Sequence, residues 1–97
     1  MNWINIHTET LRGEEFIGAE PLERATWLNL LGWSCAQEND GIILGCKSWG
    51  NRKWQQLCGV TQEEIHLESD LYHFDGDDLV VNFYPIEQQA AVKAKRE

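Results

Sequence analysis

The stretch Cys58-Gly59-Val60-Thr61-Gln62-Glu63-Glu64-Ile65 decides the fold of this chain. Thr61 and Glu64 have the Thr-x-x-Glu spacing of a capping box, in which each side chain bonds the other residue's backbone N–H at a helix start. The apolar residues on either side of this start have the spacing of a hydrophobic staple. A helix over residues 48–58 ends at Gly59, and the next helix, over residues 62–70, begins within about three residues. The sequence therefore predicts a tight helix–turn–helix.

Upstream of this motif, a longer helix is predicted to begin at Pro21, because proline suits the first position of a helix. Its apolar residues cover a wide arc, which indicates a helix that is buried on more than one side and lies at the centre of the fold. The residues of this arc are Leu22, Trp27, Leu28, Leu30, Leu31, Trp33 and Cys35. The helix is expected to stop at Asn39-Asp40-Gly41, and the apolar run over 41–45 predicts a short strand.

Downstream of the motif, two alternating runs flank the sequence Asp75-Gly76-Asp77-Asp78. Alternation on both sides of an Asp-Gly turn predicts a β-hairpin. The apolar positions are Tyr72 and Phe74 before the turn, and Leu79, Val81 and Phe83 after it. Residues 87–97 contain helix formers but little to bury, so a frayed helix or the start of a linker is expected there.

The order of these elements is that of a winged helix-turn-helix, an α+β fold with three helices in which a short strand pairs with a C-terminal hairpin, the wing. Residues 3–8 alternate like a short strand or an extended lead-in. Residues 13–18 are expected to form a loop whose Phe16 and Ile17 pack on the body. A chain of 97 residues supports one modest core, so we expect one domain over residues 1–86 and a charged tail over 87–97.

Charge is the strongest constraint on function. Asp and Glu number 16 and Lys and Arg number 8, which gives a net charge of −8. Residues 87–97 hold 2 of the acids and 3 of the bases, so the body carries 14 acids and 5 bases. The negative electrostatic field of such a body repels the phosphates of a nucleic acid. The sequence has no bilayer-spanning apolar run and no secretory signal, and its three widely spaced cysteines favour a reducing compartment, so a cytoplasmic protein is expected.

Metal binding and catalysis receive little support from the sequence. Zinc ligands would have to come from Cys35, Cys46, Cys58, His66 and His73, but close Cys-x-x-Cys spacing is absent. The wing-tip aspartates Asp75, Asp77 and Asp78 fit a turn better than a calcium loop. A Cys58–His66 dyad would need a lowered thiol pKa, which acidic surroundings oppose. We therefore expect no enzyme, no cofactor and no metal, with a redox role for the cysteines as a distant alternative.

The surface that a winged helix normally offers to DNA is acidic in this sequence. The second helix of the motif would enter the major groove. Here that helix has four acids and neither Lys nor Arg, and the wing tip adds three more acids. Neither surface suits a polyanion. Lys47, Arg52 and Lys53 form a small positive edge. We favour the interpretation that this edge is an ordinary solvated surface.

Two tryptophans of the helix over 48–58 leave two interpretations open. Trp49 and Trp54 lie five residues apart, so on one helix they point in different directions. In the first interpretation one of them lies at the surface beside Arg52 and anchors a partner. In the second, Trp49 precedes the helix and folds back over the core.

Three stretches together resemble the N-terminal winged-helix domain of phage-type replication initiator or replisome-organiser proteins. They are Arg24-Ala25-Thr26-Trp27-Leu28-Asn29-Leu30-Leu31, Gln37-Glu38-Asn39-Asp40-Gly41-Ile42-Ile43 and Trp54-Gln55-Gln56-Leu57-Cys58-Gly59-Val60-Thr61. In that group a Trp-bearing helix leads to a Gly-Ile strand, a helix-turn-helix and a wing. The resemblance covers most of the chain and implies the leading domain of a DNA replication protein, with the charged tail as the beginning of a linker.

The expected function is a non-enzymatic interaction module that docks a basic surface of a protein partner through its acidic helix and wing. Candidate partner-binding residues are Trp49, Arg52, Trp54, Glu63, Glu64, Glu68, Asp75 and Asp77. The alternative is direct DNA binding, for which the candidates are Lys47, Arg52, Lys53, Lys93, Lys95 and Arg96. No membrane and no small-molecule substrate is expected.

Overall fold

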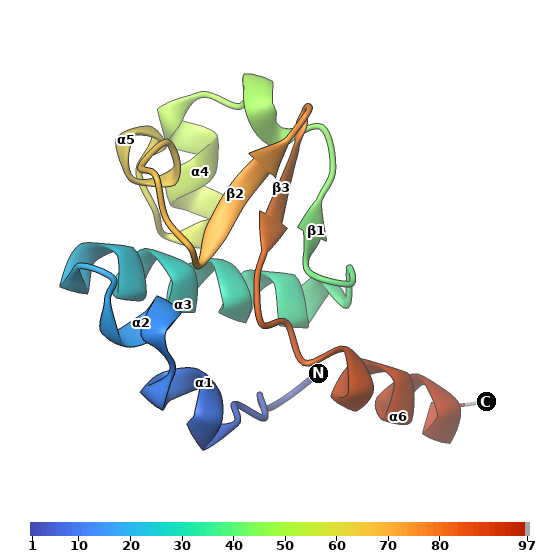
Figure 1. The fold of residues 1–97 in the computed structure, drawn as a ribbon. Coiled ribbons are helices and arrows are strands. Elements are labelled where there is room, and N and C mark those ends of the chain that lie inside the picture. Colours follow the sequence, from blue (N-terminus) through green and yellow to red (C-terminus); the bar gives the residue numbers. More distant parts are fainter. Residues whose placement is uncertain (97) are drawn as a thin grey trace.

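The computed structural model describes residues 1–96 and shows an α+β fold in which helices lie on one face and at one end of a small three-stranded antiparallel sheet (Figure 1). The helices are α1 (Thr8–Arg12), α2 (Glu14–Ile17), α3 (Pro21–Gln37), α4 (Asn51–Cys58), α5 (Gln62–Ile65) and α6 (Ile86–Arg96), with a 3-10 turn, η1, at Cys46–Ser48. The strands are β1 (Ile42–Ile43), β2 (Tyr72–Asp75) and β3 (Asp78–Val81). Residue 97, the end of the expected tail, lies outside the described residues. Among the residues described, no helix combines the length and hydropathy that a membrane span requires.

The hairpin and its partner strand agree with the prediction. β2 and β3 pair antiparallel with Asp75 opposite Asp78, and β1 pairs with β3 through Ile42 opposite Val80. The strand order β1-β3-β2 confirms that the short strand joins the hairpin. At the hairpin tip Gly76 has a φ of 63°, a value that glycine adopts without strain, so the chain turns between paired residues only three apart. This arrangement is compatible with a winged helix.

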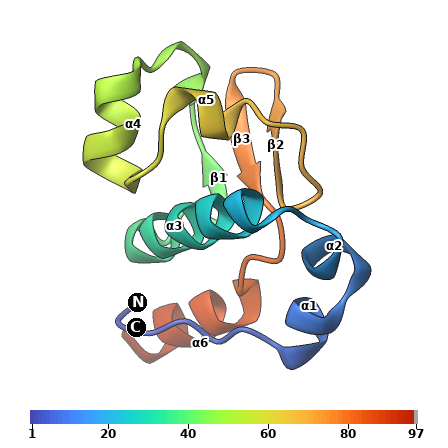
Figure 2. The same ribbon diagram turned by 90° about the vertical axis from the view of Figure 1, so that its left-hand side faces the viewer.

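Helix α3 is the central element, as its wide apolar arc predicts. It lies between a layer formed by α4, α5 and the sheet and a layer formed by the N-terminal segment, α1 and α6 (Figure 2). Trp27 is buried, and its Nε1 donates a hydrogen bond of 2.9 Å to the carbonyl of Asn82 beyond β3. The expected arc is too wide, because the two layers leave part of the helix uncovered. Leu22 is exposed, and Leu28 is 52% exposed.

The capping box that decides the turn between α4 and α5 is present in the structure. Glu64 N–H donates to Thr61 Oγ1 at 3.1 Å, and Thr61 N–H donates to Glu64 Oε1 at 2.7 Å. The length predicted for the following helix, residues 62–70, is wrong, because α5 ends at Ile65. At this end the Glu64 carbonyl accepts both the Leu67 N–H at 3.2 Å and the hydroxyl of the buried Tyr72 at 2.9 Å, so the last turn closes on a residue three positions on and the α-helical pattern stops.

Two other helical predictions also need correction. The helix expected over 48–58 begins at Asn51, and it buries Trp54 and Cys58 while Leu57 is exposed. The loop expected over 13–18 instead contains α2. Its Phe16 packs edge-on against Trp27 with ring centroids 5.7 Å apart, as expected, whereas Ile17 is exposed.

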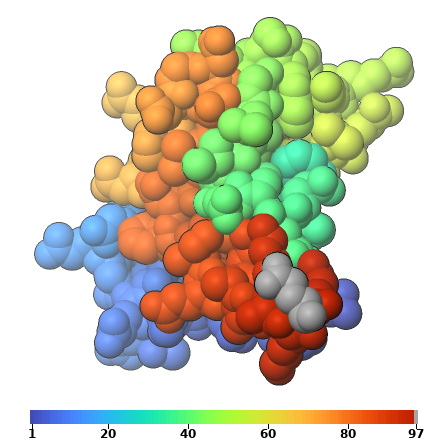
Figure 3. All heavy atoms as spheres, turned by 90° about the vertical axis from the view of Figure 1, so that its right-hand side faces the viewer, coloured from blue at the N-terminus to red at the C-terminus, as the bar shows by residue number. Residues whose placement is uncertain are grey.

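The tail expected to be a frayed helix or linker is the ordered helix α6, held to the body by polar side chains. Gln88 and Gln89 are its buried residues. Gln88 accepts the Asn5 N–H at 2.7 Å and donates to the Trp3 carbonyl at 2.8 Å, which fixes the extended lead-in over 3–7. In Figure 3 the atoms of α6 adjoin those of the segment that links α3 to β1. The folded unit therefore extends beyond residue 86.

Candidate functional site

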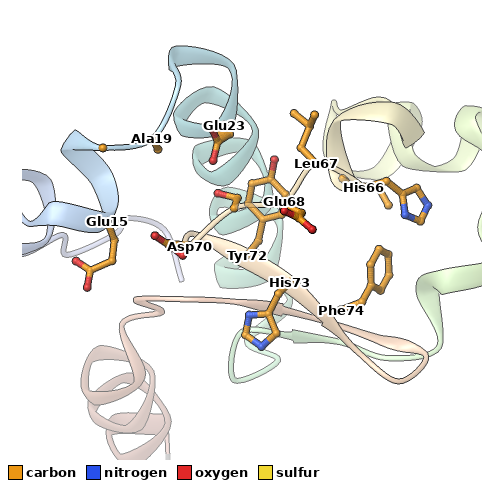
Figure 4. Close-up of a pocket in the computed structure, with 13 residues that line it drawn as sticks. Glu15, Ala19, Glu23, His66, Leu67, Glu68, Asp70, Tyr72, His73 and Phe74 are labelled. Carbon is orange, nitrogen blue, oxygen red and sulfur yellow. The ribbon is translucent and has the colours of Figure 1, made fainter.

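A hollow of about 530 Å³ lies between the α2–α3 corner and the loop that joins α5 to β2 (Figure 4). The side chains of one wall come from α2 and the first turn of α3, and those of the other wall come from residues 65–70 and β2. Its lining residues are Glu15, Gly18, Ala19, Glu23, Ile65, His66, Leu67, Glu68, Ser69, Asp70, Tyr72, His73 and Phe74. We call this hollow the acidic groove, because four carboxylates line it and neither Lys nor Arg is among these residues.

Hydrogen bonds from side chains to the backbone hold both walls of the acidic groove. Arg24 donates to the carbonyls of Phe16 at 2.9 Å and Ile17 at 2.7 Å, which ties the end of α2 to α3. On the other wall, Asn82 Nδ2 donates to the Asp70 carbonyl at 2.9 Å, and Tyr72 donates to the carbonyl of α5 described above. These contacts within the fold fix the backbone of both walls.

The carboxylates of the groove are largely unused by the fold. Glu23 Oε2 accepts the Glu20 N–H at 3.0 Å in the capping box that begins α3. Both ion pairs within residues 1–96 involve Glu38, far from this site in the sequence, so Glu15, Glu68 and Asp70 have no cationic partner there. These three carboxylates are exposed to solvent, and together they make the electrostatic field around the hollow negative.

The structure separates the acidic residues that the sequence singled out. Glu68 lines the groove, whereas Asp75 and Asp77 stand exposed at the hairpin tip and Glu63 is exposed on α5. Glu64 serves the fold, because its side chain closes the capping box. Its loss would therefore disturb a helix start as well as a surface charge.

Sequence reasoning missed three carboxylates of the groove as site residues. Glu15 and Glu23 lie about fifty residues from Glu68 along the chain, and only the folded structure brings them to one hollow. Asp70 is one of the four acids of the helix expected over 62–70, but it is not among the expected site residues. No local motif signals this set, because its members share no spacing.

The tryptophans follow the second of the two interpretations. Trp49 precedes α4 and packs against Trp33 and Trp54, with ring centroids 6.1 Å and 4.8 Å away. Trp54 is 0% exposed, so its place among the partner-binding candidates is wrong. Lys53 Nζ lies 4.4 Å from the Trp49 ring centroid, and the exposed Arg52 follows Asn51 at the start of α4.

The basic residues proposed for DNA binding form two separate sets. Lys47, Arg52 and Lys53 belong to η1 and α4, on one side of α3, and the basic residues of α6 lie on the other side (Figure 2). Arg96 is also engaged, since its guanidinium donates to both oxygens of Glu38 at 2.7 and 2.5 Å. A continuous positive groove is therefore not formed by these sets.

The three cysteines are free thiols and are buried. Burial raises the pKa of Cys35 and Cys46, and it raises the pKa of Cys58 to about 11. The Cys58 thiol is therefore protonated at neutral pH, the opposite of what a nucleophilic dyad with His66 needs. His66 is exposed and stacks on Phe74 with centroids 5.1 Å apart. Within residues 1–96, no set of three metal-ligating side chains is gathered.

Comparisons with protein-family models, with curated protein sequences and with solved structures found no match for this chain.

Proposed function

We propose that this chain is a non-enzymatic, winged-helix interaction module that docks a protein partner on its acidic face. The observation that carries the proposal is the acidic groove, a prearranged hollow whose free carboxylates complement a basic segment. Burial of unpaired charges at an interface is costly, so a partner that supplies opposite charge is strongly preferred to one that does not. The sequence resemblance to leading domains of phage-type replication proteins supports the same fold and suggests a replication complex as the setting.

A protein partner fits this surface better than DNA does. A net charge of −8 repels phosphate, and the two basic sets lie on opposite sides of α3, where they cannot follow one strand of backbone together. Lys47 Nζ is 5.8 Å from the Phe74 ring centroid and Lys53 covers Trp49, so both cations also contact rings of their own chain.

The experiment compares two baits in partner capture from the cells that make the protein. One bait is the wild-type chain, and the other carries Glu15→Gln, Glu68→Gln, Asp70→Asn, Asp75→Asn and Asp77→Asn. We expect quantitative mass spectrometry to find basic proteins that the wild type retains and the variant loses, and we expect their retention to fall as salt rises.

DNA binding is measured in parallel by fluorescence anisotropy with short duplex and single-stranded DNA at low and moderate salt. The proposal predicts no saturable binding. Tight binding that falls steeply with salt and disappears in Arg52→Gln/Lys53→Gln would instead establish the DNA-binding alternative.

A further inference from the structure

We propose that the α-amine of Met1 controls the docking of residues 1–7 and α6, as a site whose covalent state is read by the fold. A free, charged amine holds both segments at the end of α3, and an acyl group on this nitrogen releases them. The acyl group can be a formyl group, an acetyl group or the carbonyl of a preceding residue, because each of these removes the same charge. This inference is independent of the proposed function.

The two ion pairs within residues 1–96 meet on a single carboxylate. Glu38 accepts hydrogen bonds from the Met1 amine at 3.0 Å and from the Arg96 guanidinium at 2.7 and 2.5 Å. The side-chain exposed fractions are 0% for Met1 and 13% for Glu38, whereas Arg96 is 56% exposed. An exposed pair contributes little, but loss of one partner of a shielded pair leaves the other charge uncompensated. Glu38 therefore depends more on the amine than on Arg96.

The end of α3 is arranged to receive this cation. The last turn of α3 contains no basic residue, and the carbonyl of Cys35 accepts the Met1 amine at 3.3 Å. A positive charge is favoured at this position, because the C-terminal end of a helix carries a partial negative charge. The same carbonyl accepts the Glu38 N–H at 3.2 Å. The amine, the helix end and the carboxylate thus form one connected cluster.

Residues 1–7 connect this cluster to α6, and they run alongside that helix in Figure 2. Gln88 accepts the Asn5 N–H at 2.7 Å and donates to the Trp3 carbonyl at 2.8 Å, so one buried side chain holds the backbone at two places. Displacement of residues 1–7 would leave both polar groups of Gln88 without these partners, which is costly for a buried amide. A change at the amine is therefore transmitted to α6.

Acylation alters the hydrogen-bonding capacity of the Met1 nitrogen as well as its charge. A protonated amine has three N–H donors, whereas an acylated nitrogen has one N–H and no charge. Hydrolysis reverses the change. Water gives its oxygen and one hydrogen to the acyl carbon as the N–C bond breaks, and its other hydrogen goes to the nitrogen. The proton of the released acid then passes to the amine, which leaves a carboxylate and an ammonium group.

Semisynthesis of the full chain provides the forms that test this switch. A synthetic thioester of residues 1–34 is ligated to residues 35–97, for which Cys35 supplies the natural junction. The synthetic peptide carries either a free α-amine or an Nα-acetyl group, and each form is made with Glu38 and with Glu38→Gln. The control, Lys93→Gln with a free amine, removes an exposed positive charge from α6 itself. Thermal melting establishes that each form is folded.

Hydrogen exchange of the α6 amides is compared among these forms. We expect acetylation to accelerate their exchange about tenfold or more in the chain with Glu38, because a charged hydrogen bond to a shielded carboxylate is lost. In Glu38→Gln the pair is already absent, so acetylation should change the rate less than about twofold. Lys93→Gln should also change it less than about twofold, and exchange in β3 should be nearly the same in all forms.

Unchanged exchange of α6 after acetylation would overturn the proposal. Equal acceleration by acetylation in the Glu38 and Glu38→Gln chains would also overturn it, because the bulk of the acyl group and not the charge pair would be responsible. An effect of Lys93→Gln as large as that of acetylation would show a general effect of charge and would reject the Met1 amine as the site. Equal acceleration in α6 and β3 would reject selective release of residues 1–7 and α6.

Discussion

Two regions of this molecule are held together by different interactions, apolar packing in the first and side-chain hydrogen bonds in the second. The core body, which comprises α3, α4, α5 and the three strands, buries apolar side chains such as Trp27, Trp54 and Leu79. The polar layer, which comprises residues 1–7 and α6, contributes Gln88 and Gln89 as its buried residues. It does place some partly buried apolar side chains, such as Ile4, against the core.

This difference separates the contacts that stabilise the fold from the contacts that position a segment. Burial of a large apolar side chain contributes about 1.5–3 kcal/mol, whereas one intramolecular hydrogen bond contributes a net of about 1 kcal/mol. The glutamines of α6 therefore specify where the helix docks more than they strengthen the docking. We expect the polar layer to open before the core body unfolds.

The largest expected effect compares one tryptophan from each region. Trp54→Ala removes a fully buried indole from the core body and should lower the free energy of unfolding by about 3–5 kcal/mol. Trp3→Ala, in the polar layer, removes a side chain that is 61% exposed and should lower it by less than about 1 kcal/mol. Chemical denaturation of both variants measures the difference. Equal losses of unfolding free energy in the two variants would contradict the division into two regions.

A smaller effect is expected from Gln89→Ala, which tests the polar attachment directly. Gln89 accepts the Asp40 N–H at 3.2 Å, donates to Asp40 Oδ1 at 2.5 Å and accepts the Tyr84 hydroxyl. Its removal should lower the free energy of unfolding by about 1–3 kcal/mol, because buried polar groups lose their partners.

Hydrogen exchange locates the effect of that substitution. Amides of α6 should exchange faster in Gln89→Ala than in the wild type, and amides of β3 should be nearly unchanged. The control, Gln37→Ala, alters an exposed glutamine at the end of α3 and should leave both sets unchanged. Equal acceleration in α6 and β3 would show that the two regions unfold as one.

The smallest effect is the pH response of the polar layer. Arg96 and the Met1 amino group, which donates at 3.0 Å, lower the pKa of Glu38 from 4.5 to about 2. Because the folded-state pKa is below the ordinary value, the ionised carboxylate favours docking above about pH 4.5, and this contribution is lost as pH falls toward 2. Exchange of α6 amides should rise over this range in the wild type, and Glu38→Gln should remove that dependence. A wild-type profile that is flat over the range would contradict the role of Glu38.

Local signals in the sequence were sufficient for the turns and the strand pairing. Thr61 and Glu64 form the capping box that their spacing predicts, and the Asp-Gly turn forms the predicted hairpin. These features depend on residues within a few positions of each other. The same kind of reasoning failed for the length of α5, because a capping box specifies where a helix begins and not where it ends.

Features that depend on distant packing could not be predicted in this way. Leu28 fits an apolar arc but is exposed, because the arc says nothing about how much of α3 its neighbours cover. Helix α6 looked too polar to dock, yet its glutamines bond to backbone and side chains over eighty and about fifty residues away. For the candidate site, the negative charge and Glu68 were foreseen, whereas the hollow was not.

The three buried thiols allow the opening of the molecule to be measured by chemical modification. Cys35 lies where the polar layer meets α3, since its carbonyl accepts a hydrogen bond from the Met1 amino group at 3.3 Å. All three thiols belong to the hydrophobic core, with exposed fractions of 1% for Cys35, 0% for Cys46 and 6% for Cys58. A thiol-specific reagent should therefore reach Cys35 when the layer lifts, and should reach Cys46 only when the core body opens. The unmodified chain thus reports two events by two separate rates of alkylation, and needs no attached probe.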